Sequence, residues 1–288
     1  MDGMTFAPGV APQPFGGRAV VGRPRKVERA PEPDPALKLA SLVESEVIPR
    51  LLLSRRANAA ERRPSAAHVE TLARLALSRD PGAAAAQVFA LRDAGMPVEV
   101  LLNDLITPAA RRVGGFWTED SVDFVEVALA TGRLVAVVRA LGAHGEAAAR
   151  ETRIAAGAPS ALIATVGAER HGLGALTAAQ TLRCGGWRVR EAAGVSANAL
   201  VVLASRAKFD MIGLSLGGDR NLDEIARLIA RLRRASRNRR AAIALGGPAC
   251  LEDATLGARL GADFTASSGR EALSLAQAHL NSVIESVK

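Results

Sequence analysis

The chain has 288 residues, of which 49% are hydrophobic, and a formal charge of +8. This length is sufficient for two domains, and no apolar run is long enough to cross a membrane. Cys184 and Cys250 lie far apart without metal-ligand spacing, which excludes a disulfide framework and favours a reducing compartment. Because the N-terminus also lacks the pattern of a secretory signal, we expect a cytoplasmic protein with no membrane partner.

The N-terminal part of the chain separates into a tail and a helical region. Residues 1–35 hold half of the 14 prolines, a basic cluster and no hydrophobic period, so we predict a disordered basic tail. Helical periodicity begins at residue 36, and Pro49 interrupts its first helix. Further helices are predicted over residues 65–78, 81–93, 98–113 and 121–141, with a break at Gly114–Trp117. Apolar stripes on successive helices predict a helical bundle over residues 36–150.

The pattern changes in residues 151–288. Short apolar strands are predicted at residues 161–166, 187–192, 211–215, 241–245 and 263–266. Amphipathic helices are predicted at residues 173–182, 197–208, 222–235, 249–260 and 270–287. Five alternating units of this kind predict a flavodoxin-like, Rossmann-like, doubly wound α/β domain, so the fold class is a helical bundle followed by an α/β domain.

A histidine follows the first predicted strand and precedes its helix. His171 thus lies at the carboxyl end of a strand, the edge where open α/β sheets bind ligands. Glu169 can hold one imidazole nitrogen while the other faces a metal, the usual arrangement for a ligating histidine. Alternatively, His171 caps or packs in an ordinary turn. Two more signals, Ser215 with Gly217 and the pair Gly246-Gly247, follow the third and fourth strands.

All three signals lie at carboxyl ends of strands, so we expect them to face one crevice. Together they resemble the cobalamin-binding family, whose signature is Asp-x-His-x-x-Gly, then Ser-x-Leu, then Gly-Gly. This chain offers Glu169-x-His171-x-x-Gly174, Ser215-x-Gly217 and Gly246-Gly247. The resemblance implies that His171 is the lower axial ligand of cobalt. It further implies that Ser215 borders the nucleotide base of the cofactor and that the glycine pair gives the base room.

The helical half resembles the cap of light-sensing cobalamin regulators. Trp117 corresponds to a tryptophan near the upper axial group, and Glu126 corresponds to a cap glutamate. Ala128 stands where that family carries a histidine. The group of photosynthesis antirepressors named AerR/PpaA, which act on repressors of the CrtJ/PpsR type, is most similar to this chain in the stretches 108–117 and 126–133 and in the segment 42–52.

The resemblance implies a light- or redox-responsive regulator, not an enzyme, with adenosyl- or hydroxocobalamin as cofactor. Two alternatives remain open: a corrinoid protein that carries a methyl group in a methyltransferase system, and a sensor that binds heme through the same pocket. The arginine run 231–240 is interpreted as a solvated face, and indirect or weak contact with DNA is left open.

Overall fold

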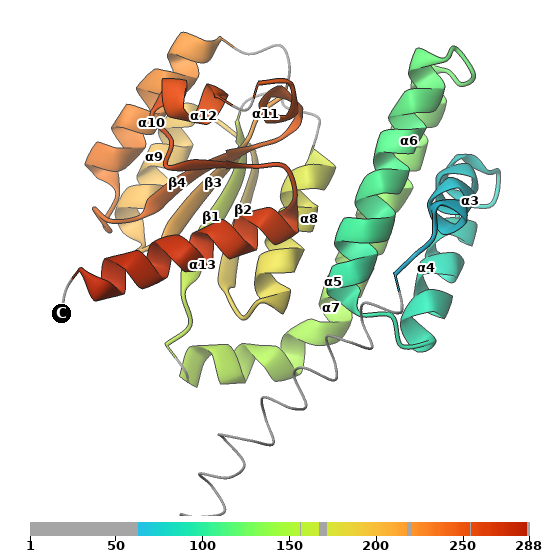
Figure 1. The fold of residues 1–288 in the computed structure, drawn as a ribbon, viewed down its shortest axis with the longest axis horizontal. Helices are drawn as coiled ribbons and strands as arrows, with labels where there is room; N and C mark the ends of the chain where they lie inside the picture. The colour runs from blue at the N-terminus through green and yellow to red at the C-terminus, as the bar shows by residue number, and fades with distance from the viewer. Residues whose placement is uncertain (1–62, 156, 167–171, 218–220, 254, 287–288) are drawn as a thin grey trace, which may run out of the picture. The chain divides into compact units, whose positions relative to one another are not determined.

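The computed structural model describes residues 63–155, 157–166, 172–217, 221–253 and 255–286 (Figure 1). The predicted tail 1–35 and the helix expected over 36–56 lie outside the described residues. The described residues belong to one compact unit. The domain boundary expected at residue 150 therefore stays a prediction.

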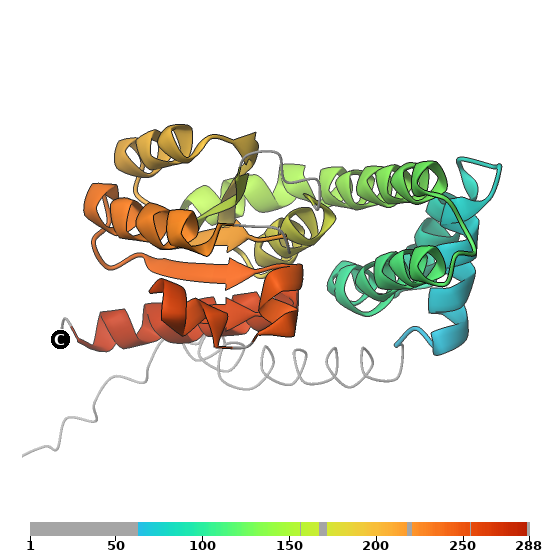
Figure 2. The ribbon, with the colours of Figure 1, turned by 90° about the horizontal axis from the view of Figure 1, so that it is seen from above.

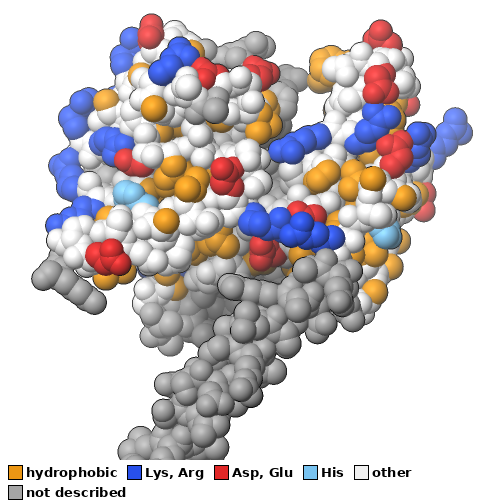
Figure 3. All heavy atoms as spheres, viewed as in Figure 1, with side chains coloured by type: hydrophobic (Ala, Val, Ile, Leu, Met, Phe, Trp, Pro, Cys, Tyr) orange, Lys and Arg blue, Asp and Glu red, His pale blue; other side chains and the backbone are white. Residues whose placement is uncertain are grey.

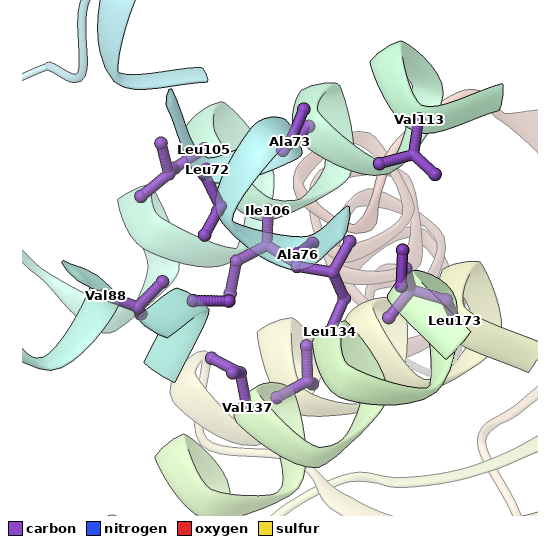
Figure 4. Packing of buried hydrophobic residues seen from close by; sticks show 14 of the residues in the cluster. Leu72, Ala73, Ala76, Val88, Leu105, Ile106, Val113, Leu134, Val137 and Leu173 are labelled. Atoms are coloured by element: carbon purple, nitrogen blue, oxygen red, sulfur yellow. The ribbon is translucent and has the colours of Figure 1, made fainter. Parts of the chain in front are cut away.

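Helices make up the first part of the described chain. They are α3 (Ala66–Leu77), α4 (Ala83–Asp93), α5 (Val98–Val100), the π-helix η2 (Leu101–Ile106), α6 (Thr107–Thr118) and α7 (Phe124–Ala155). One face of each helix packs into a shared apolar core, which also takes Leu173 and Leu176 from α8 (Gly172–Cys184) (Figure 4). The first turn of α8 is thereby buried against the helical region.

The break predicted at Gly114–Trp117 is wrong, because α6 continues through these residues to Thr118. Two glycines cost a helix about 1 kcal/mol each. Val113 and Phe116 offset this cost, since both are buried in the helical core, and the guanidinium of Arg112 lies 4.0 Å from the Phe116 ring centroid. Tertiary packing thus outweighs helix propensity at this position.

The second part is a parallel five-stranded sheet covered by helices on both faces. Its strands are β1 (Ser160–Val166), β2 (Arg188–Val195), β3 (Met211–Ser215), β4 (Ala242–Gly246) and β5 (Phe264–Ala266), in the order β2-β1-β3-β4-β5. The helices are α8, α9 (Ala197–Arg206), α10 (Leu222–Ala235), α11 (Pro248–Glu252), α12 (Leu256–Leu260) and α13 (Gly269–Glu285). This is the flavodoxin-like order, which confirms the predicted fold class.

Two layers of helix enclose the sheet (Figures 1 and 2). The helices α8 and α13 pack on one face, and α9, α10 and α12 pack on the other. The single helix predicted over 249–260 is wrong, because it divides into α11 and α12. The Asp253 carboxylate accepts hydrogen bonds from the backbone N–H and the hydroxyl of Thr255, which favours a turn there. No helix in the described ranges is both long and apolar enough to span a bilayer.

Candidate functional site

The strands that carry the three sequence signals are neighbours in the sheet. β3 lies between β1 and β4, and all three run parallel, so their carboxyl ends meet at one edge. Thr165 of β1 pairs with Ser215, and Ser215 pairs with Gly246. We call these three residues the edge row. The strands that precede the three signals therefore end at one edge of the sheet, as the sequence predicts.

The two faces of the central strands differ in the size of their side chains. Toward α8 and α13 the strands present Met211, Gly213, Ser215, Ala242, Ala244 and Gly246, whereas the opposite face carries Ile212, Leu214, Ile243 and Leu245. Successive residues of a strand point to opposite faces, so small and large residues alternate along β4 and along β3 after Met211. That alternation is visible in the sequence and indicates which face has the smaller side chains.

The hydroxyl groups of the edge row differ in their partners. The Thr165 Oγ1 accepts a hydrogen bond of 2.9 Å from the backbone N–H of Gly194, which ties β1 to the edge strand β2. Ser215 is 8% exposed, yet its hydroxyl has no partner among the residues that the structure describes. Nearly buried hydroxyls are normally hydrogen-bonded, because desolvation without a partner costs free energy. Ser215 is thus an available donor and acceptor at the edge of the sheet.

The glycine pair after β4 brings two loops together. Gly247 has φ 97°, and a Cβ on it would lie 2.4 Å from the carbonyl oxygen of Leu216. A Cβ on Gly246 would lie 3.1 Å from the carbonyl oxygen of Ala266, and Gly217 is buried beside Leu216. The space around Gly247 is thus taken by the chain's own backbone. That the pair also gives a ligand room stays a prediction.

Open space lies at the start of α8. A Cβ on Gly172 or Gly174 would meet no atom within 4 Å. A cavity of about 100 Å³ lies nearby between α7, the start of α8 and the ends of β1 and β2, with Thr165 and Gly172 in its lining. Glu169 and His171, predicted to form the axial ligand and its support, lie outside the described residues and directly precede α8.

Polar contacts fasten the helical region to α8 and α13. Arg270, in the first turn of α13, donates hydrogen bonds to both carboxylate oxygens of Asp104 and to Glu99. The contact with Asp104 is the main reason that the pKa of Arg270 lies above its ordinary value. Asn103 donates to the Thr181 hydroxyl and accepts from the backbone N–H of Arg270. We call this group the latch.

The latch residues Asn103 and Asp104 lie in the π-helix η2. A π-helical segment shifts the register of the side chains that follow it and is frequent at functional sites. Further along, Arg111 of α6 donates to the carbonyl of Ser267, in the loop between β5 and α13. No motif in the sequence indicates any of these contacts.

The end of the helical region beyond this contact is apolar and exposed. Trp117 lies six residues after Arg111, so α6 runs about 9 Å further along its axis at 1.5 Å per residue. Trp117 is 52% exposed, and Phe124, Val125 and Leu129 at the start of α7 are all more than half exposed. We call these four residues the apolar end.

Glu126 has a defined local role at the apolar end. Its carboxylate accepts a hydrogen bond from the backbone N–H of Asp123, and the Asp123 carboxylate accepts one from the N–H of Glu126. This reciprocal pair is a capping box that begins α7. Contact between Glu126 and a cofactor therefore stays a prediction. Contact between Trp117 and a cofactor is likewise a prediction.

Comparison with known proteins identifies the family. Residues 159–276 match the model of the B12 binding domain. A Rhodobacter capsulatus protein, named as an uncharacterized 20.5 kDa protein in the bchF-crtJ intergenic region, is 32% identical over 173 residues, which span 60% of this chain and 88% of that protein. The chain belongs to the B12-binding family. The resemblance to cobalamin-binding proteins of the AerR/PpaA type is thereby confirmed.

A solved structure supports the B12-binding fold independently. The monomethylamine corrinoid protein of Methanosarcina barkeri superposes with a TM-score of 0.56, covering 71% of this chain and 94% of that chain. At 16% identity this likeness concerns the fold alone. It agrees with an N-terminal helical region followed by a five-stranded parallel sheet.

The described residues of this B12-binding chain fit a corrinoid at the carboxyl edge. The unpartnered Ser215 hydroxyl gives a polar group for the nucleotide tail, and the neighbouring position Gly246 has no side chain. A Cβ on Gly174 would meet no atom within 4 Å, so the start of α8 has open space. His171, to which the resemblance assigns the cobalt ligand, lies outside the described residues, so its role stays a prediction.

Proposed function

We propose that this chain is a cobalamin-binding sensory regulator rather than an enzyme. In this proposal it is a light- or redox-responsive antirepressor that acts through a transcriptional repressor of the CrtJ/PpsR type. The relative from the bchF-crtJ intergenic region supports this assignment, because its location links the family branch to crtJ.

The observation that carries the proposal is the apolar end of α6 and α7. Contiguous exposed apolar side chains usually mark a site for a ligand or a partner. The four residues of the apolar end account for most of the exposed large hydrophobic side chains in the described ranges. They stand beyond the Arg111 contact with the loop that follows β5, on the side of the sheet edge predicted to hold cobalt.

Each part of the edge then has a role. His171 would hold the cobalt, Glu169 would hold the imidazole, and Ser215 would hydrogen-bond the nucleotide tail. Trp117 would cover the corrin. When bound, the corrinoid would supply a cobalt centre that responds to light or to a change of redox state.

The latch gives a route from the upper face to the rest of the molecule. A change in the contacts of Trp117 alters the position of α6, and the preceding η2 segment is fastened to α13 through Asn103 and Asp104. A ligand event at one end thereby biases a two-state contact between the helices and the sheet.

Reconstitution tests the cofactor and the signal together. The purified chain is mixed with adenosylcobalamin, hydroxocobalamin or heme, and its absorbance spectrum is recorded in darkness and after illumination. We expect binding of the corrinoids and a light-dependent spectrum with adenosylcobalamin. Binding of heme alone would reject the corrinoid. A light-stable complex that accepts a methyl group from a methyltransferase would instead identify a methyl carrier.

Substitutions then separate the roles of the two key side chains. His171→Ala should remove the axial imidazole signature from the corrinoid spectrum. The matched control His279→Ala should leave the spectrum unchanged, since that ring interacts with the Arg240 carbonyl at 3.1 Å. Trp117→Ala should preserve corrinoid binding but alter the light-dependent change in affinity for the repressor. An equal response of Trp117→Ala and the parent would refute the sensory role of the apolar end.

A further inference from the structure

A dense group of cations lies on the α/β domain away from the cofactor edge. Seven arginines and no acidic residue occur between Ile225 and Ala241. The buried face of α10 consists of Ile225, Leu228, Ile229 and Leu232, so packing explains the apolar positions of this helix. The arginines occupy its remaining positions and the turn that follows, and all but Arg231 are exposed.

The ends of two helices meet at this place. The backbone N–H of Arg237 donates to the carbonyl of Ala204 in α9, and its guanidinium donates to the carbonyl of Arg206. In a parallel α/β sheet the helices return toward the amino ends of the strands, so this place lies at the edge opposite Ser215 and Gly246. Lys and Arg side chains gather along the left margin of Figure 3, where α9 and α10 lie in Figure 1.

Structural roles account for part of the group. Arg233 pairs with Asp263 at 2.9 Å, Arg231 donates to Asn198, and Arg239 donates to the carbonyl of Arg233. Cations that reach free carbonyls at the end of a helix also compensate the helix dipole. These arginines therefore need no external ligand.

The remaining cations have no such role. Five exposed side chains have no hydrogen-bond or ion-pair partner among the residues that the structure describes: Arg206, Lys208, Arg227, Arg234 and Arg240. We call these five residues the basic face. Like charges placed together repel one another, and no acidic residue lies between Arg227 and Arg240 to offset them, which favours an external anion as their partner.

The composition of the surroundings indicates which anion. Specific protein–protein interfaces have a desolvated centre rich in aromatic and apolar side chains. Among the described residues of α9 and α10, Val202 is the only large hydrophobic side chain that is exposed. Trp117 and its neighbours lie on α6 and α7. A surface of cations with almost no apolar centre is typical of contact with a phosphate backbone.

We propose that the basic face binds the phosphate backbone of duplex DNA without reading its sequence. This activity goes beyond the proposed regulation through a repressor, because it gives the chain a DNA contact of its own. The cofactor edge lies at the opposite ends of the strands, so both surfaces are accessible at the same time. In a complex with a DNA-bound repressor, the basic face would hold the regulator against the flanking duplex.

The salt dependence of DNA binding tests this proposal. The full chain is titrated with a fluorescent 30-base-pair duplex of arbitrary sequence between 50 and 200 mM salt. Five phosphate contacts predict a slope of about −4.5 in log K against log salt, or about a 500-fold loss of affinity over this range. The triple variant Arg227→Gln, Arg234→Gln, Arg240→Gln retains two contacts, and its slope should fall to about −2.

A control with the same loss of charge separates the basic face from the overall charge. Arg63→Gln, Arg79→Gln, Arg190→Gln also removes three exposed arginines that have no partner within the described ranges. This variant should retain the parental slope. Unchanged absorbance of the corrinoid complex in both triple variants would show that the fold and the cofactor site are intact.

Three results would overturn the proposal. The parent could fail to bind the duplex at 50 mM salt, or both triple variants could lose affinity equally. The chain could also bind an acidic polypeptide such as polyglutamate as tightly as the duplex, which would identify an acidic protein as the partner. Failure of corrinoid reconstitution with intact DNA binding would reject the proposed sensor and leave the basic face unaffected.

Discussion

Removal of the Ser215 hydroxyl should have opposite effects on stability and on cofactor binding. The Ser215→Ala variant loses one nearly buried oxygen that has no partner within the described residues. A fully buried unpartnered polar group costs about 1–3 kcal/mol. Because the Ser215 oxygen keeps contact with solvent, its cost lies below this range, and the cofactor-free variant should gain about 0.5 kcal/mol. In a unit of this size that gain raises Tm by about 1–2 °C.

The same change should weaken corrinoid binding. A neutral hydrogen bond contributes about 1 kcal/mol net, so Kd should rise about fivefold if Ser215 bonds the nucleotide tail. Thr165→Val is the matched control, since Thr165 lies beside Ser215 in the edge row but accepts a hydrogen bond from Gly194. Loss of the Thr165 hydroxyl leaves the backbone N–H of Gly194 unpaired, so the Thr165→Val variant should be destabilised by about 1–2 kcal/mol.

Thermal unfolding of the cofactor-free proteins and absorbance titration with hydroxocobalamin measure the two effects. The reasoning requires that Ser215→Ala raises Tm while it raises Kd, and that Thr165→Val lowers Tm. A lower Tm for Ser215→Ala would show that its hydroxyl has an internal partner. An unchanged Kd would show that Ser215 does not touch the cofactor.

Three further changes test other parts of the fold. Gly247→Ala should lower the free energy of unfolding by about 3 kcal/mol or more, measured in urea, because φ 97° is strained for alanine and its Cβ would overlap the Leu216 carbonyl. Arg270→Gln should cost about 1 kcal/mol, or about 3 °C in Tm, because the pair with Asp104 is only partly shielded from water. Burial raises the pKa of the Cys250 thiol, so iodoacetamide should modify Cys250 at pH 8 in urea but only slowly in the folded protein, as mass spectrometry would detect.

Local patterns were sufficient to predict much of the α/β part. The predicted bounds of α10 agree with the structure, because Asn221 caps its first turn and its apolar residues repeat at helical spacing. The bounds of β3 also agree, since a short buried run ends in Ser215. The order of the central strands follows from the alternation of strands and helices, and it places the three sequence signals at one edge.

Contacts between distant residues could not be predicted in this way. The backbone N–H of Arg270 and the side chain of Asn103 are 167 positions apart, yet their hydrogen bond fixes the π-helical segment at the latch. The continuation of α6 through Gly114 depends on the packing of Phe116, which no local propensity describes. The exposure of Trp117 likewise depends on which helices surround it.

The small residues of β3 and β4 differ in what surrounds them. Within the sheet they accommodate neighbouring side chains, since a Cβ on Gly213 would lie 2.7 Å from Cδ1 of Ile163. At the carboxyl edge, a Cβ on Gly246 would lie 3.1 Å from the backbone oxygen of Ala266, so the chain's own backbone already explains this glycine. The Ser215 hydroxyl, by contrast, is unpartnered among the described residues. The proposed function therefore predicts that a nucleotide tail contacts Ser215 rather than the glycines, and that it approaches beside the start of α8, where a Cβ on Gly172 or Gly174 would meet no atom within 4 Å.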